Sequence, residues 1–288
     1  MLAHIDLFSG LGGFALAAQW AGFKTVVFCE IEPFCQEVLK ARFGAVADTE
    51  SREAVSPKPG RLHSQSGLQN TKPLLIPNIR DFDGRRWRGA TLLTGGFPCQ
   101  PFSCAGKRKG TADDRWLWPE MLRVISEARP TWGLGENVAG IVNMELEHTC
   151  ADVEAEGYEV QPIVIPACAV NAPHKRNRVW IIANNSKNPV LGRNGGRSDG
   201  DKAELRRTLQ TTRPDSHAPD TSSELGEQLL HAQRRSWEEP WPEVATRLCR
   251  VDDGVPRRVD RLKALGNAIV PQVAYEIIKE IARIEEIK

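Results

Sequence analysis

A single cysteine, Cys99, stands between two prolines in the segment Gly-Gly-Phe-Pro-Cys-Gln-Pro-Phe-Ser of residues 95–103. The apolar run of residues 90–94 before it is typical of a β-strand, so the thiol is expected on a loop that follows a strand. Prolines restrict such a loop because they fix φ. A thiolate held there is a candidate nucleophile for covalent catalysis, and a buried structural cysteine is the alternative.

A glycine-rich segment, Asp-Leu-Phe-Ser-Gly-Leu-Gly-Gly, spans residues 6–13 between an expected strand and an expected helix. Glycines at such a turn let the backbone bend tightly and let a ligand approach the helix N-terminus. Glu30 ends the next expected strand, where a carboxylate can accept hydrogen bonds from ribose hydroxyls. The pattern predicts a nucleotide-type cofactor and leaves NAD and S-adenosylmethionine both open.

Strand-like and helix-like segments alternate along the first half of the chain, which predicts an α/β fold with a parallel sheet covered by helices. An amphipathic helix is expected at the C-terminal end, with an apolar stripe of Val273, Ile277, Ile281 and Ile284. The expected strands are residues 3–8, 25–29, 90–94, 132–134, 158–165 and 179–183, and the expected helices are residues 14–21, 34–42, 119–128 and 144–156.

Composition narrows the class of protein without naming a function. The chain has 288 residues and a formal net charge of +1, so any binding to nucleic acid must come from local basic patches. Its seven cysteines include no Cys-x-x-Cys pair and no Cys/His spacing that suits zinc, so no metal site is expected. No signal peptide or membrane-spanning run is recognisable, and we expect a cytoplasmic protein.

Two stretches depart from the alternating pattern. Residues 48–73 are polar and predict an inserted loop. Residues from 184 to about 250 are rich in Gly, Asn, Asp, Arg and Ser and carry few apolar anchors. We therefore expect a catalytic, cofactor-binding domain of residues 1–183 plus 262–288, and a small loop-rich target-recognition region of residues 184–261.

The glycine-rich opening and the Pro-Cys-Gln-Pro-Phe-Ser loop together resemble the DNA cytosine-5 methyltransferases. The other motifs of that family follow in the family's order. They are Asp114-Arg115-Trp116-Leu117, Glu136-Asn137-Val138, His174-Lys175-Arg176-Asn177-Arg178 and Gly266-Asn267-Ala268-Ile269-Val270. His174 stands where the family commonly has Gln, and the motif that usually precedes the last one is not recognisable.

The resemblance implies a Rossmann-like, S-adenosylmethionine-dependent methyltransferase sheet with helices on both faces. It also implies a sequence-specific enzyme of the restriction–modification or phage type, which methylates carbon 5 of a cytosine flipped out of duplex DNA and releases S-adenosylhomocysteine. Cys99 would attack carbon 6, Glu136 would stabilise charge at N3, and Arg178 would contact O2 or the neighbouring backbone. Arg176 would support Arg178 through contacts with a phosphate or with the cysteine loop, and Asn137 would lie beside Glu136. We expect a monomer.

The resemblance also implies a set of cofactor-binding residues. Glu30 would hold the ribose and Ile31 would cover the adenine, while Asn267 would close the pocket beside the methionine end. Asn78-Ile79 is the nearest match to an Asp-Ile pair that many members place near the adenine. The full set is Asp6, Phe8, Gly10, Leu11, Gly12, Gly13, Glu30, Ile31, Asn78, Ile79, Gly96, Pro98, Asn267 and Ala268.

Three other interpretations fit parts of the sequence. An RNA cytosine-5 methyltransferase could use the same scaffold, although the Pro-Cys-Gln-Pro-Phe-Ser loop favours DNA. A DNA-binding protein that has lost activity is opposed by the presence of Cys99, Glu136 and Arg178. A dehydrogenase would bind NAD and would need no Pro-Cys loop.

Overall fold

The structure, a computed structural model, describes residues 2–48, 71–98, 116–143, 145–185 and 258–286. All of these except Arg258 belong to one compact unit, made of Met1–Arg193 and Val259–Lys288. The second unit, Asn194–Arg258, otherwise lies outside the described residues. The expected recognition region of residues 184–261 therefore stays a prediction.

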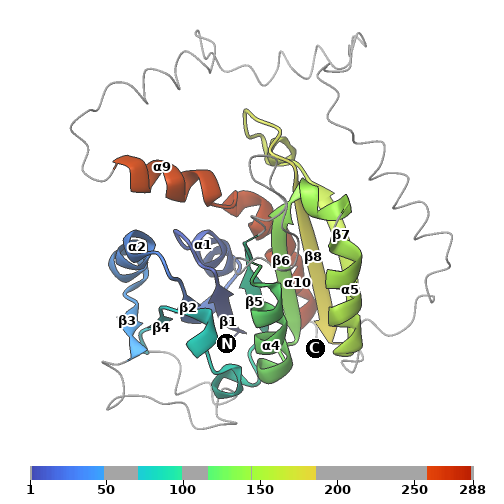
Figure 1. The fold of residues 1–288 in the computed structure, drawn as a ribbon, viewed down its shortest axis with the longest axis horizontal. Helices are drawn as coiled ribbons and strands as arrows, with labels where there is room; N and C mark the ends of the chain where they lie inside the picture. The colour runs from blue at the N-terminus through green and yellow to red at the C-terminus, as the bar shows by residue number, and fades with distance from the viewer. Residues whose placement is uncertain (1, 49–70, 99–115, 144, 186–257, 287–288) are drawn as a thin grey trace, which may run out of the picture. The chain divides into compact units, whose positions relative to one another are not determined.

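Eight strands form one sheet in the order β3-β4-β2-β1-β5-β6-β8-β7 (Figure 1). The first six strands of that order run parallel, as the alternating pattern predicts, whereas β8 lies between β6 and β7 and runs antiparallel to both. The strands are β1 Leu2–Leu7, β2 Phe23–Cys29, β3 Val46–Ala47, β4 Leu74–Ile76, β5 Leu92–Gly95, β6 Trp132–Val138, β7 Tyr158–Ile165 and β8 Arg178–Asn185.

Helices cover both faces of the sheet. On one face α1 packs against α10, and Leu39 of α2 joins Ala15 of α1 and Phe28 of β2 in one cluster. On the other face lie α4 and α5 (Figure 1). The α-helices are α1 Gly13–Trp20, α2 Pro33–Phe43, α4 Trp118–Ala128, α5 Leu146–Ala155, α9 Arg258–Asn267 and α10 Pro271–Glu286; 3₁₀ turns are η2 Ile79–Asp81, η3 Gly84–Trp87, η6 Ala139–Asn143 and η7 Ala167–Val170.

The C-terminal helix is amphipathic, as its sequence predicts, but its buried face differs from the expected stripe. Val273, Ile278 and Ile281 are buried against the sheet, together with two alanines. Ile277 and Ile284 are only partly buried at the edge of this cluster. The buried face of the helix therefore consists of Val273, Ala274, Ile278, Ile281 and Ala282, and its two alanines leave room for α1.

No helix among the described residues is long and apolar enough to cross a bilayer.

Candidate active site

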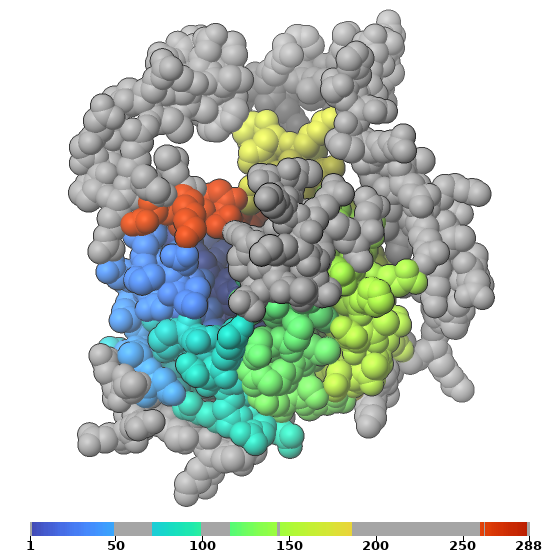
Figure 2. All heavy atoms as spheres, in the orientation of Figure 1, coloured from blue at the N-terminus to red at the C-terminus, as the bar shows by residue number. Residues whose placement is uncertain are grey.

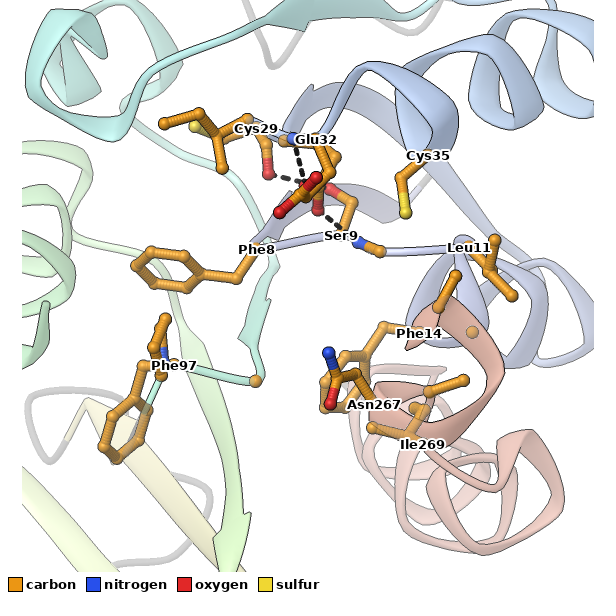
Figure 3. Close-up of a pocket in the computed structure, with 18 of the residues that line it drawn as sticks. Phe8, Ser9, Leu11, Phe14, Cys29, Glu32, Cys35, Phe97, Asn267 and Ile269 are labelled. Atoms are coloured by element: carbon orange, nitrogen blue, oxygen red, sulfur yellow. Dashed lines mark hydrogen bonds between the residues drawn. The ribbon is translucent and has the colours of Figure 1, made fainter. Parts of the chain in front are cut away.

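A cavity of about 930 Å³ opens at the carboxyl ends of the parallel strands, which is where open α/β sheets bind ligands. Phe8 and Phe97 lie on one side of it and Leu11, Asn267 and Ile269 on the other (Figure 3). Apart from the cysteine and Arg176, the sequence predicts seventeen residues in the site, and fifteen of them line this cavity: Phe8, Gly10, Leu11, Gly13, Glu30, Ile31, Asn78, Ile79, Gly96, Pro98, Glu136, Asn137, Arg178, Asn267 and Ala268.

The glycine-rich loop turns sharply between β1 and α1. Gly10 and Gly12 have φ of 54° and 80°, in the left-handed region that favours glycine, and Phe8 adopts φ of 52° despite its side chain. The Gly12 N–H donates to the carbonyl of Ser9 at 2.8 Å. This turn directs the N-terminus of α1 toward the cavity.

Glu30 joins the glycine-rich loop to the end of β2. Its Oε2 accepts from the Gly10 N–H at 2.6 Å and its Oε1 accepts from the Glu32 N–H at 2.7 Å. Burial raises the pKa of the Glu30 carboxyl, and these two N–H donors oppose the rise. The carboxylate is thus oriented by the backbone while it borders the cavity.

Two of the expected cofactor residues lie behind the wall of the cavity. Asp6 is fully buried, and its Oδ1 accepts from Thr94 Oγ1 at 3.0 Å. Thr94 also pairs with His4 Nε2 at 2.8 Å, and burial raises the pKa of Asp6 well above its ordinary value. Gly12 lies so close to the Phe43 ring that a Cβ would overlap it. Asp6 and Gly12 therefore support the conformation of the glycine-rich loop and do not line the cavity.

Glu136 and Arg178 meet across neighbouring antiparallel strands. Arg178 Nε lies 2.8 Å from Glu136 Oε1, and the two side chains are 20% and 10% exposed. Burial raises the pKa of Glu136 to about 7, against the opposing effects of Arg178 and Arg176. Asn137 faces the segment before the cysteine, because its Nδ2 donates to the carbonyl of Phe97 at 3.1 Å.

Arg176 does not line the cavity, and its described contacts are with the last motif, while the expected phosphate or cysteine-loop contacts stay a prediction. Its Nη2 donates to the carbonyls of Gly266 and Ala268, at 2.9 and 2.8 Å. These carbonyls flank Asn267 at the C-terminal end of α9, where carbonyl groups lack helical partners and a cation is favourable. Cys99 lies outside the described residues, as does the rest of its loop up to residue 115.

Several cavity residues were not anticipated from the sequence. Phe97 and Ile269 belong to the quoted motifs and could have been included on that ground. Lys263 had no comparable signal; it reaches from α9 to Glu32 Oε1 at 2.6 Å, on the α2 side of the cavity. Figure 2 shows α9 lying against the N-terminal segment at this surface. Within the described ranges, no three His, Cys, Asp or Glu side chains gather as a metal site would require.

An open α/β sheet with a glycine-rich first turn and an acidic end to the second strand defines a Rossmann-like domain, and the buried pair of Glu136 and Arg178 gives it a candidate catalytic centre. Comparison with known proteins gives the family. The model of the C-5 cytosine-specific DNA methylases matches residues 2–58 and 68–246, and the chain belongs to this family.

Individual relatives agree with this assignment. The chain is 33% identical over 184 residues to the type II methyltransferase M.PspPI of Psychrobacter sp. (strain TA137), a match that covers 62% of this chain and 38% of the relative. It is 31% identical over 186 residues to M.HhaI of Haemophilus parahaemolyticus, covering 63% and 48%. The chain thus matches less than half the length of either relative.

A solved structure supports the fold. A mutant of the Spodoptera frugiperda protein DNMT2 is similar with a TM-score of 0.50 and 20% identity, over 69% of this chain and 54% of that one. The Rossmann-like fold class predicted from the sequence is confirmed.

Proposed function

We propose that this chain transfers a methyl group from S-adenosylmethionine to carbon 5 of a cytosine flipped out of duplex DNA, through a covalent bond between Cys99 and carbon 6. The observation that carries the proposal is the pair of Glu136 and Arg178, 2.8 Å apart, which lines the same cavity as the glycine-rich loop. We infer a sequence-specific, monomeric, cytoplasmic enzyme whose residues 184–261 select the target site.

The residues around the cavity suit S-adenosylmethionine. A volume of about 930 Å³ accommodates a nucleoside joined to an amino acid. Glu30 would accept hydrogen bonds from the ribose hydroxyls, Ile31 and Ile79 would border the adenine, and Asn267 would face the methionine end. When bound, the cofactor supplies an electrophilic methyl group on a sulfonium.

Carbon 5 of cytosine is a poor nucleophile, and addition of the Cys99 thiolate to carbon 6 moves an electron pair toward carbon 5 and N3. A carboxyl that is protonated near neutral pH stabilises this charge by donating a hydrogen bond to N3. The raised pKa of Glu136, about 7, suits that role. After carbon 5 has gained the methyl group, loss of its proton to a base and departure of the thiolate restore the aromatic ring.

The target carbon is inaccessible inside a base stack, so the cytosine must rotate out of the duplex at a cost of about a few kcal/mol. Arg178 would then contact O2 of the flipped base while it keeps Glu136 in place. Arginine suits both contacts because its planar fork carries several donors.

The first experiment compares wild type with Cys99→Ser. The variant is expected to lose methylation of duplex DNA while S-adenosylhomocysteine binds with nearly unchanged affinity, because the thiol acts only on the base. Methylation at the wild-type rate would overturn the mechanism. A duplex that contains 5-fluorocytosine is expected to form a covalent adduct at Cys99, visible by mass spectrometry.

The substrate is tested separately. Duplex DNA and tRNA are offered in competition, and sequencing of methylated cytosines from cells that express the protein reads the recognition site. Methyl transfer to tRNA alone would replace DNA by RNA as the substrate. Binding of NAD in place of S-adenosylhomocysteine would overturn the cofactor assignment.

A further inference from the structure

The segment that follows β4 forms one wall of the cavity. Pro77, Asn78, Ile79 and Arg80 all line it. The Glu30 N–H donates to the carbonyl of Ile76 at 3.1 Å, so this segment begins directly beside the backbone of Glu30. Under the proposed function, it borders the adenosine part of the cofactor.

Arg123 of α4 holds this segment from outside the cavity. Its Nη2 donates to the carbonyl of Ile79 at 2.8 Å and its Nη1 donates to the carbonyl of Phe82 at 2.9 Å. The guanidinium is oriented by two acids of its own helix, Glu120 at 2.9 Å from Nε and Glu127 at 2.9 Å from Nη1. All three nitrogens are therefore engaged, and Arg123 itself does not line the cavity.

A second contact fixes the far end of the same segment. The Gly84 N–H donates to Glu127 Oε2 at 2.8 Å, the same oxygen that Arg123 reaches. A Cβ at Gly84 would lie 2.9 Å from Glu127 Cβ and 3.0 Å from the carbonyl oxygen of Val124, so this close approach requires glycine. In Figure 2 the segment that begins at residue 71, in cyan, lies against the green region that contains α4.

We propose that Arg123 is a positioning residue for cofactor binding: it sets the wall at Asn78–Ile79 through carbonyl contacts and so determines the affinity for the adenosine part of S-adenosylmethionine. The proposal rests on the proposed function. Its physical basis is that the guanidinium spans two carbonyls and two carboxylates at once, which a single ammonium cannot do.

The test measures binding of S-adenosylhomocysteine and 5′-methylthioadenosine by calorimetry to the full chain, without DNA. Arg123→Lys is expected to weaken both ligands by the same factor, about ten-fold, since hydrogen bonds from a charged donor are lost on the wall that both ligands share. Asn267→Ala is expected to weaken S-adenosylhomocysteine alone, because methylthioadenosine has no amino-acid end.

The matched control is Arg129→Lys. Arg129 directly follows the same helix, has the same side-chain exposure of 33%, and donates to the carbonyl and carboxylate of Glu156. Neither residue lines the cavity. This control is expected to bind both ligands as the wild type does.

In turnover, Arg123→Lys is expected to raise KM for S-adenosylmethionine with little change in kcat or in KM for DNA.

Three results would overturn the proposal: wild-type affinity in Arg123→Lys, equal losses in Arg123→Lys and Arg129→Lys, or a loss confined to S-adenosylhomocysteine. If Arg123→Lys fails to fold, Gly84→Ala replaces it, because this substitution displaces the segment without removing a charge. Binding of both ligands to Gly84→Ala with wild-type affinity would likewise contradict the proposal. Failure of the wild type to bind S-adenosylhomocysteine would instead overturn the proposed function.

Discussion

Arg178 Nε lies 2.8 Å from Glu136 Oε1, yet the pKa of Glu136 is raised to about 7 and not lowered. Burial outweighs the cation because the carboxylate has lost its water at the end of β6. The folded chain therefore holds a proton on Glu136 at pH values where the unfolded chain, with a pKa near 4.5, has released it.

The first prediction is a pH-dependent difference in stability between wild type and Glu136→Gln. Because the folded state binds the extra proton, the free energy of unfolding of the wild type falls as pH rises from 4.5 through 7. The total loss relative to the variant is about 3 kcal/mol. Urea unfolding at pH 4.5 to 8 measures it, and a difference that does not change with pH would contradict the prediction.

The second prediction concerns acid unfolding and His4. Burial lowers the pKa of His4 to about 3, and its two ring nitrogens lie 2.8 Å from Thr25 Oγ1 and Thr94 Oγ1. The folded state thus excludes a proton that the unfolded state takes up below pH 6.5. Stability due to neutral His4 is present above that pH and is lost toward pH 3, by about 1.4 kcal/mol per pH unit at the steepest.

His4→Gln, which keeps a donor and an acceptor, is expected to be less stable at neutral pH but to lose less stability between pH 6 and 4. Parallel stability curves for the two proteins over that range would show that His4 does not titrate on unfolding.

The third prediction links the glycine-rich loop to the last motif. A Cβ at Gly13 would lie 2.7 Å from Ile269 Cγ1, closer than real side chains approach. Gly13→Ala is expected to weaken S-adenosylhomocysteine binding about ten-fold, because the overlap forces apart two residues that both line the cavity and so changes its shape. In an Ile269→Ala background the same substitution is expected to have a smaller effect. Equal effects in both backgrounds would show that the two residues are not coupled.

Much of the site was predictable because parallel strand ends converge. Glu30 followed from its place at the end of the second strand, and its hydrogen bond to the Gly10 N–H joins the two features that were recognised together. Glu136 and Arg178 were expected through the resemblance. Their contact depends on the antiparallel placement of β8 beside β6, which no local pattern in the sequence specifies.

The contacts of Arg123 with the segment after β4 could not be predicted from strand ends or from motifs. Its main partners are the carbonyls of Ile79 and Phe82, and every residue carries a carbonyl, so the sequence offers no partner to recognise. Ile278 was missed for a related reason: the apolar residues of the last helix allow two neighbouring stripes, and the structure buries the one that includes Ala274 and Ala282. The position of Cys99, outside the described residues, is still a prediction.

The last prediction separates two roles for Arg176. Its Nη2 donates to the carbonyls of Gly266 and Ala268, which flank Asn267. Loss of two hydrogen bonds from a partly exposed cation is worth about 1–2 kcal/mol. Arg176→Ala is therefore expected to weaken S-adenosylhomocysteine binding about ten-fold in the absence of DNA, with Arg176→Lys intermediate.

The control for this variant is Arg283→Ala, which removes an exposed arginine paired with Glu280 on α10 and is expected to leave binding unchanged. If Arg176 acted only on a DNA phosphate, its removal would leave S-adenosylhomocysteine binding at the wild-type value and would lower the affinity for duplex DNA and its dependence on salt concentration. The carbonyl contacts favour the first result, because they engage both protons of Nη2 and join the guanidinium to the two residues that flank Asn267.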